Sequence, residues 1–254
     1  MTSATGTVLV TGAGRRIGKA IAMDLAARGY HIAIHANTSG REAEAVAASI
    51  RDSGGVAEVF LADLTDADAV RKLHGTVCAR LGFPDIIVNN ASVFEDDSVR
   101  DFDEKQFDLH FAIHLKAPVI LAEAMAASLP EGRDGLIVNI IDQRVWKLTP
   151  NFFSYTLSKT ALWTATQTMA QALAPRIRVN AIGPGPTLAN ERQKESDFAR
   201  QSAAVPLGHG PDLAEFGATI RYLHQAGSIT GQMIALDGGQ HLAWQTPDVI
   251  DVGE

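Results

Sequence analysis

The sequence has little cysteine, few aromatic residues and an excess of acid over base. Its single cysteine, Cys78, excludes an internal disulfide, and we expect it to be an ordinary helix residue. The net charge of -7 argues against a nucleic-acid partner, because binding a polyanion needs a basic surface. No apolar run approaches the ~18 residues that cross a bilayer, and a strand-like run at 7–10 leaves no room for a signal peptide. We therefore expect a cytoplasmic protein without a membrane or nucleic-acid partner.

What is present is a globular composition arranged in alternating segments. Hydrophobic residues make up 46% of the 254 residues, enough to fill a large core. Short apolar runs, typical of strands buried on both faces of a parallel sheet, alternate with segments of helical periodicity such as 17–28 and 41–53. The predicted strands are 7–11, 31–35, 56–61, 85–89, 135–141, 177–181 and 232–236. This alternation predicts one doubly wound α/β domain of the Rossmann type over residues 1–254.

Two segments lack a regular pattern. Residues 183–210 contain several prolines and glycines, and we expect this long irregular segment to be a lid-like loop that determines the substrate. The tail at 244–254 is acidic at its end, and two hypotheses remain open for it: disorder, or cover for a subunit interface.

A glycine-rich loop follows the first predicted strand and precedes a helix. Gly12 permits a tight turn, and Gly18 permits close packing of the helix on the strand. The free N–H groups at the helix start attract a pyrophosphate. The sequence therefore predicts a dinucleotide site, whose contacts in this loop are Gly12, Arg15, Arg16, Ile17 and Gly18.

The end of the second predicted strand indicates which dinucleotide is used. Enzymes that prefer NAD place an acidic residue there to hold the ribose 2′-hydroxyl, and this sequence has none. Cations and hydrogen-bond donors suit a 2′-phosphate instead. They are supplied by Arg15 in the loop and by Asn37, Thr38 and Ser39 at the strand end. Arg16 faces the same point, and His35 is a further expected cofactor contact. We therefore expect NADPH to be the cofactor.

Tyr155 and Lys159 lie four residues apart in a helix predicted over 152–174, so both side chains share one face. A free phenol, with a pKa near 10, is a poor acid at neutral pH. We expect the neighbouring ammonium to lower the pKa of Tyr155 and so prepare it as a general acid. The pair follows the fifth strand, where a site at the carboxyl ends of the strands requires it.

Together these motifs resemble the short-chain dehydrogenase/reductase family. They are the loop 11–18, the run Asn89-Asn90-Ala91-Ser92, Tyr155-x-x-x-Lys159, Gly183-Pro184-Gly185 and the closing Leu236-Asp237-Gly238-Gly239. The resemblance implies seven parallel strands, hydride transfer to or from nicotinamide, and a homotetramer. It places Asp63 at the adenine, Asn90 at a ribose, Lys159 also at the nicotinamide ribose, and the backbone after Pro184 and Gly185 at the carboxamide. Leu64, Ala91 and Ser92 are further expected cofactor contacts.

One departure from the family pattern concerns the catalytic residues. Most members place a serine 13 residues before the tyrosine, and here that position is Asp142. An ionised carboxylate only accepts hydrogen bonds and would repel a developing alkoxide. Asp142 is therefore protonated, or faces a substrate rich in N–H groups, or relays a proton to Tyr155. A pterin satisfies the last two conditions, because its reduced bond is C=N and a nitrogen must be protonated.

The sequence resembles the pteridine reductase branch at these positions. That branch has an aspartate at 142, an arginine at 16 and Asn-Ala-Ser-x-Phe over 90–94. The likeness implies that Phe94 stacks the pterin against the nicotinamide, that Ser92 hydrogen-bonds it, and that Arg16 reaches both pyrophosphate and pterin. Two positions depart from the pattern. Thr38 replaces an arginine of the branch, and His114 replaces the catalytic asparagine of the family.

His110 and His114 have metal-ligand spacing on one helix, but no third ligand is suitably placed, so we expect no metal. The leading hypothesis is an NADPH-dependent reductase of a pterin or dihydropterin-like ring. One alternative is a carbonyl reductase, such as a 3-oxoacyl reductase, with Asp142 protonated. Another is an NADPH sensor without turnover, which the intact Tyr155 and Lys159 pair does not favour.

Overall fold

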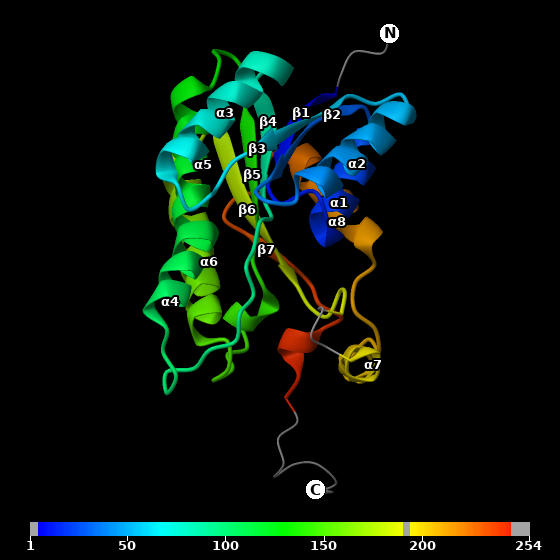
Figure 1. Ribbon diagram of the computed structural model, residues 1–254, viewed down its shortest axis with the longest axis vertical. Coiled ribbons are helices and arrows are strands. Elements are labelled where there is room, and N and C mark those ends of the chain that lie inside the picture. The colour runs from blue at the N-terminus through cyan, green and yellow to red at the C-terminus, as the bar shows by residue number, and fades with distance from the viewer. Residues whose placement is uncertain (1–4, 190–193, 245–254) are drawn as a thin grey trace, which may run out of the picture.

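The computed structural model describes residues 5–189 and 194–244 and places seven parallel strands in one sheet of order β3-β2-β1-β4-β5-β6-β7 (Figure 1). The strands are β1 Gly6–Val10, β2 Tyr30–Ala36, β3 Ala57–Leu61, β4 Pro84–Asn89, β5 Gly135–Ile140, β6 Ile177–Pro184 and β7 Met233–Leu236. Each predicted strand is present with its ends shifted by no more than three residues. The prediction of a doubly wound, seven-stranded parallel sheet is confirmed.

Helices cover both faces of the sheet, as Figure 1 shows. The helices are α1 Arg16–Ala26, α2 Gly40–Asp52, α3 Ala67–Leu81, α4 Glu104–Phe111, α5 Ala117–Ser128, α6 Phe153–Leu173, α7 Glu195–Ala203 and α8 Leu213–Gln225. Buried residues of α1, α2 and α8 pack on one face, and those of α3, α5 and α6 pack on the other. Within β1, Val8 and Val10 belong to the first core and Leu9 to the second. This two-sided burial explains why the strands read as unbroken apolar runs.

The segment 183–210 is more regular than predicted. β6 continues to Pro184, and α7 occupies Glu195–Ala203, so the expectation of one irregular loop is wrong for these residues. α7 has acidic residues in its first turn and Arg200 in its last, which suits the helix dipole. None of its residues is buried, so it has no apolar stripe from which a helix could be predicted. Residues 190–193 and the part of the tail at 245–254 lie outside the described residues.

One helical stretch of the described chain, Glu104–Ser128, is long and apolar enough to cross a membrane by length and composition alone. The absence of a long uninterrupted apolar run did not predict this. Ile120, Leu121 and Met125 of this stretch are buried in the second core. A core helix of a water-soluble protein passes the same test, so the finding is weak evidence for a membrane span.

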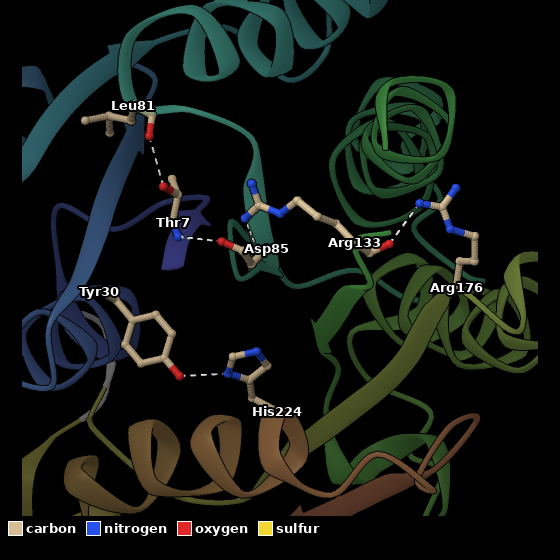
Figure 2. Close-up of polar contacts among 7 residues, drawn as sticks. All are labelled: Thr7, Tyr30, Leu81, Asp85, Arg133, Arg176 and His224. Atoms are coloured by element: carbon tan, nitrogen blue, oxygen red, sulfur yellow. Dashed lines mark hydrogen bonds and ion pairs between the residues drawn. The ribbon is translucent and has the colours of Figure 1, made fainter. Parts of the chain in front are cut away.

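Polar contacts fix the end of the sheet at which the strands begin (Figure 2). The carboxylate of Asp85 accepts a hydrogen bond from the backbone N–H of Thr7 at 2.8 Å and forms an ion pair with Arg133. The hydroxyl of Tyr30, the first residue of β2, lies 2.7 Å from Nδ1 of His224 on α8. These contacts join β1 to β4, β4 to the loop before β5, and β2 to α8, and they leave the carboxyl ends of the strands for a site.

Candidate active site

The glycine-rich loop lies between β1 and α1, at the point where the chain order of the sheet reverses between β1 and β4. Gly12 has a φ of 64°, and a Cβ there would lie 2.9 Å from Cα of Ala91. A Cβ on Gly18 would lie 2.5 Å from the carbonyl oxygen of Gly12. Glycine is therefore required at both positions, by the turn and by the close approach of backbone to backbone. The resulting cradle fits the pyrophosphate of a dinucleotide.

Asn90 and Thr11 hold this loop against the end of β4. The side-chain amide of Asn90 donates to the carbonyl oxygens of Thr11 at 2.9 Å and Gly12 at 3.2 Å. The Thr11 hydroxyl accepts from the backbone N–H groups of Asn90 and Ala91. Asn90 is predicted to line a cofactor ribose, and what the structure shows is that its side chain braces the loop.

His35 supports the loop from inside the protein. Its Nδ1 accepts a hydrogen bond from the N–H of Gly12 at 3.2 Å, so the proton lies on Nε2, which donates to the carbonyl of Ala62 at 3.1 Å. Burial lowers the pKa of His35, which keeps the ring neutral. Both ring nitrogens are thus occupied within the protein, whereas the sequence had suggested a ligand contact. Asn37 and Thr38 are exposed beside it.

The two arginines of the loop point to different neighbours. Arg15 forms an ion pair with Glu42 in the first turn of α2, on the side where the second strand ends. Arg16 has a φ of 52°, and its guanidinium donates to the carbonyls of Leu188 and Ala189 at 3.0 and 2.7 Å. Arg15 therefore lies toward the predicted 2′-phosphate position, and Arg16 is bound to the segment after β6.

Four further predicted cofactor contacts, Asp63, Leu64, Pro184 and Gly185, lie at the carboxyl ends of β3 and β6. The Asp63 carboxylate is exposed, and hydrogen bonds from the backbone N–H and hydroxyl of Thr65 lower its pKa. The neighbouring Leu64 is buried. A Cβ on Gly185 would lie 2.6 Å from Cα of Asp237, so this turn after β6 also requires glycine.

Asp142, Tyr155 and Lys159 come together beyond the end of β5. The hydroxyl of Tyr155 donates to Oδ2 of Asp142 at 3.0 Å, and the backbone N–H of Arg144 donates to Oδ1 at 2.8 Å. Nζ of Lys159 donates to the carbonyl of Ile140 at 2.8 Å and lies 5.7 Å from the centre of the Tyr155 ring. The structure thus places the predicted carboxylate in direct contact with the predicted acid.

The expectation that Lys159 lowers the pKa of Tyr155 is wrong for this structure. Burial, and next the charge of Asp142, raise the pKa of the phenol well above its ordinary value. Burial also raises the pKa of Asp142, although Arg144 opposes this. The pKa of Lys159 falls to about 8, again chiefly through burial. Tyr155 is therefore fully protonated at neutral pH.

His114 lies beneath Tyr155 in a π-helical turn, Ala112–Lys116, between α4 and α5. Its Nε2 accepts from the N–H of Val93 at 3.2 Å and lies 2.9 Å from the Ser92 hydroxyl, so Nδ1 carries the proton and donates to Ser158 at 2.8 Å. Burial, and next the charge of Lys159, hold its pKa well below the ordinary value. His114 is thus a neutral ring that connects the end of β4 to α6, the catalytic helix, which carries Tyr155 and Lys159. Helical turns of this type occur frequently at functional sites.

An aromatic group closes the other side of Tyr155. Phe94 meets the Tyr155 ring edge to face at 4.8 Å between centroids and stacks on Phe152 at 4.3 Å. The guanidinium carbon of Arg144 lies 5.2 Å and 4.9 Å from the centres of these two phenylalanine rings. Phe94 was predicted from the resemblance. Phe152 and Arg144 were not, because nothing in the sequence links residues so far apart.

Asp97, a further residue that the sequence did not indicate, caps the catalytic helix from another loop. Its buried carboxylate accepts from the N–H of Ser154 at 3.0 and 3.2 Å, at the start of α6. Phe152, immediately before the helix, has a φ of 55°, an uncommon conformation for a bulky residue. Such strain is found where the surrounding contacts determine the geometry of a site.

The comparisons with known proteins identify the family. A family model described as short chain dehydrogenase matches residues 6–199. The chain belongs to the short-chain dehydrogenase family. It is therefore an oxidoreductase, and the predicted resemblance is confirmed at this level.

Individual relatives differ in the activity that their names give. The solved structure of FolM, alternative dihydrofolate reductase 1, from Brucella canis in complex with NADP has a TM-score of 0.94 and is 62% identical over 97% of this chain and 98% of that one. The Brucella suis protein, also solved with NADP, has the same TM-score and is 61% identical over 96% and 98%. The 3-oxoacyl-[acyl-carrier-protein] reductase FabG of Staphylococcus aureus is 30% identical over 94% of this chain and 99% of its own.

Proposed function

We propose that this short-chain dehydrogenase uses NADPH to reduce a C=N bond in a dihydropterin-like ring, and that dihydrofolate is within its substrate class. The observation that carries this proposal is the 3.0 Å contact between the Asp142 carboxylate and the Tyr155 hydroxyl. A carboxylate at this position accepts hydrogen bonds from ring N–H groups, which a pterin has and a simple ketone lacks. The two Brucella proteins, whose names give dihydrofolate reduction, support the same conclusion.

The cofactor is NADPH, in line with the NADP found in both Brucella structures. When bound, it supplies the hydride. The loop from Gly12 to Gly18 would hold its pyrophosphate, and Arg15 with Asn37, Thr38 and Ser39 would hold its 2′-phosphate. The other proposed contacts are His35, acting through Gly12, and Asp63, Leu64, Asn90, Ala91, Ser92, Tyr155, Lys159, Pro184 and Gly185.

Tyr155 acts as the general acid in this mechanism. The phenol is protonated at neutral pH, the form that gives a proton to a substrate nitrogen, but its raised pKa makes it a weak acid, so proton transfer depends on groups that stabilise the phenolate. The charge of Arg144 and a hydrogen bond from Ser92 stabilise the phenolate that remains. Asp142 orients the hydroxyl, binds ring N–H groups and, once it has taken up a proton from solvent, passes that proton to the Tyr155 phenolate.

Phe94 stacks on the substrate ring, and Ser92 hydrogen-bonds it. In the structure one face of the Phe94 ring stacks on Phe152, so the surface of Phe94 that is left for a substrate ring lies beside Tyr155. Arg16, bound to the carbonyls after β6, would connect the pyrophosphate to the segment that covers the substrate. We further propose that one domain, residues 1–254, carries all these functions, and that the enzyme is a cytoplasmic homotetramer.

Reduction of a 3-oxoacyl substrate is the second candidate, because the Staphylococcus relative has that activity in its name. Asp142 argues against it, since a carboxylate would repel the alkoxide that forms from a ketone unless it is protonated. A sensor without turnover is disfavoured by membership of an oxidoreductase family.

The proposal is tested with the purified enzyme and a panel of dihydrofolate, dihydrobiopterin and acetoacetyl-CoA, each with NADPH and with NADH. Oxidation of the nicotinamide is followed by its absorbance. We expect turnover of the dihydropteridines with NADPH. Turnover of acetoacetyl-CoA alone would overturn the proposal in favour of the second candidate.

A further inference from the structure

A cavity of about 420 Å³ lies beside the catalytic residues. Its walls are the 3₁₀ helix Gln143–Val145, the loop that follows this helix, α7 and the turn Gln240–Leu242. The size is typical of small-molecule sites, roughly 300–1,000 Å³. The 3₁₀ helix directly follows Asp142, so the wall of the cavity that it forms begins next to the catalytic aspartate. We call the cavity the basic pocket and define it by Gln143, Arg144, Lys147, Phe152, Gln201 and Gln240.

The charge of the basic pocket is opposite to that of the whole protein, which carries -7. Arg144 and Lys147 line it, and none of its described lining residues is an aspartate or glutamate. Nζ of Lys147 donates one hydrogen bond, to the carbonyl of Ala243 at 2.7 Å, and an ammonium has three to give. Within residues 5–189 and 194–244, Arg144 has no carboxylate at ion-pair distance. The pocket therefore suits an anion.

Two buried polar atoms in its wall have no hydrogen-bond partner among the described residues. They are Oε1 of Gln143, a residue only 6% exposed, and Nη1 of Arg144. Buried polar atoms are nearly always paired, and an unpaired one needs an explanation. An amide N–H would satisfy the first atom and a carboxylate the second.

The basic pocket is continuous with the aromatic group of the active site. Phe152 lines the pocket and stacks on Phe94, whose ring meets that of Tyr155. Arg144 contacts both phenylalanines and lines the pocket. A ring that stacks on Phe94 at Tyr155 would extend its substituent past Arg144 and Phe152 into the pocket.

We propose that the basic pocket binds an acidic aryl-amide tail attached to the reduced ring, so that the enzyme is selective for dihydrofolate-type substrates over dihydropteridines without such a tail. Phe152 packs on the aryl group, Gln143 accepts from the amide N–H, and Arg144 and Lys147 bind the carboxylates. This inference rests on the proposed function and specifies its substrate.

The test compares dihydrofolate with dihydrobiopterin, which has no acidic tail. In the wild type and in Lys147→Glu, kcat/KM is measured for both substrates with saturating NADPH, and the ratio of the two values is the readout. One charged hydrogen bond contributes about 1.5–3 kcal/mol, so we expect the ratio to fall at least tenfold in the variant. Lys105→Glu, the same change at an exposed position on α4, is the matched control and should keep the wild-type ratio.

Binding of p-aminobenzoyl-glutamate, the tail alone, is measured by calorimetry and gives a readout that does not depend on turnover. We expect weak, salt-sensitive binding with a Kd on the order of 1 mM, which Lys147→Glu abolishes. An unchanged ratio in Lys147→Glu, or no binding of the fragment at low salt, overturns the inference. Fragment binding by an enzyme that reduces neither dihydropteridine would instead overturn the proposed function and leave the pocket assignment standing.

Discussion

Replacing Asp142 with serine tests the chemistry of the site most directly. In the structure Oδ2 accepts the Tyr155 hydroxyl at 3.0 Å, and Oδ1 is held by the backbone N–H of Arg144. A hydrogen bond to a charged group contributes about 1.5–3 kcal/mol, which corresponds to roughly 10- to 150-fold in rate. We expect Asp142→Ser to lower kcat/KM for dihydropteridines by at least this factor. The loss of a residue that holds ring N–H groups adds to the effect.

The same variant should have the opposite effect on a ketone. A serine hydroxyl donates to a carbonyl oxygen, and removal of the carboxylate ends its repulsion of the alkoxide. Activity on acetoacetyl-CoA should therefore stay equal or rise. Both activities are measured by loss of nicotinamide absorbance, with the exposed Asp108→Ser as control. Undiminished dihydropteridine turnover in Asp142→Ser would refute this reasoning and leave the family assignment intact.

Four further predictions concern the general acid, the cofactor contact Arg15, the catalytic lysine and the buried histidine. Tyr155→Phe should reduce turnover by about 10²- to 10⁴-fold and change the Kd for NADPH far less, because the other cofactor contacts remain; retention of most activity would contradict the mechanism. Arg15→Ala should weaken NADPH binding about tenfold relative to NADH binding, whereas Glu42→Gln, which frees the Arg15 guanidinium, should tighten NADPH binding. Equal affinities of the wild type for the two cofactors would refute the assignment of Arg15 to the 2′-phosphate. The reductive kcat/KM should fall as pH rises through about 8, because the Lys159 ammonium is present below its pKa and lost above it. Lys159→Arg should flatten this pH profile, and an unchanged fall in the variant would assign the titration to another group. His114→Ala removes the ring from the buried Ser158 hydroxyl and from the half-buried N–H of Val93, and should lower the free energy of unfolding by about 1–3 kcal/mol, measured in urea. His114→Asn should recover most of this loss.

The sheet and the catalytic pair were predictable because each depends on local pattern. Runs such as 136–141 are buried on both faces, so their continuous hydrophobicity alone indicates a central strand. Tyr155 and Lys159 share a helix, and their spacing fixes their common face. α7 was missed for the converse reason, since it buries nothing and so has no apolar periodicity.

The parts of the site that were not predictable depend on contacts between distant residues. Asp97 caps the catalytic helix from the loop after β4, and Phe152 stacks on Phe94 across a separation of 58 positions in the sequence. The wrong expectation for the pKa of Tyr155 has the same origin. A lysine four residues away suggests a lowered phenol pKa, but the degree of burial, which the sequence does not give, is the larger cause and raises it.

The two departures from the family pattern, Asp142 and His114, contact different parts of Tyr155 and act on it differently. The carboxylate of Asp142 accepts a hydrogen bond from the Tyr155 hydroxyl. His114 meets the Tyr155 ring edge to face, at 5.3 Å between centroids, and stays neutral. A protonated imidazole there would repel Lys159 and compete with it as the cation near the phenol. Burial prevents this, and it also lowers the pKa of the stacked neighbour His110. Two histidines beside an acid would ordinarily give a titration near pH 6.5. In this site burial lowers the pKa of both rings, which favours their neutral form and leaves Lys159, whose pKa is about 8, as the group expected to titrate beside Tyr155.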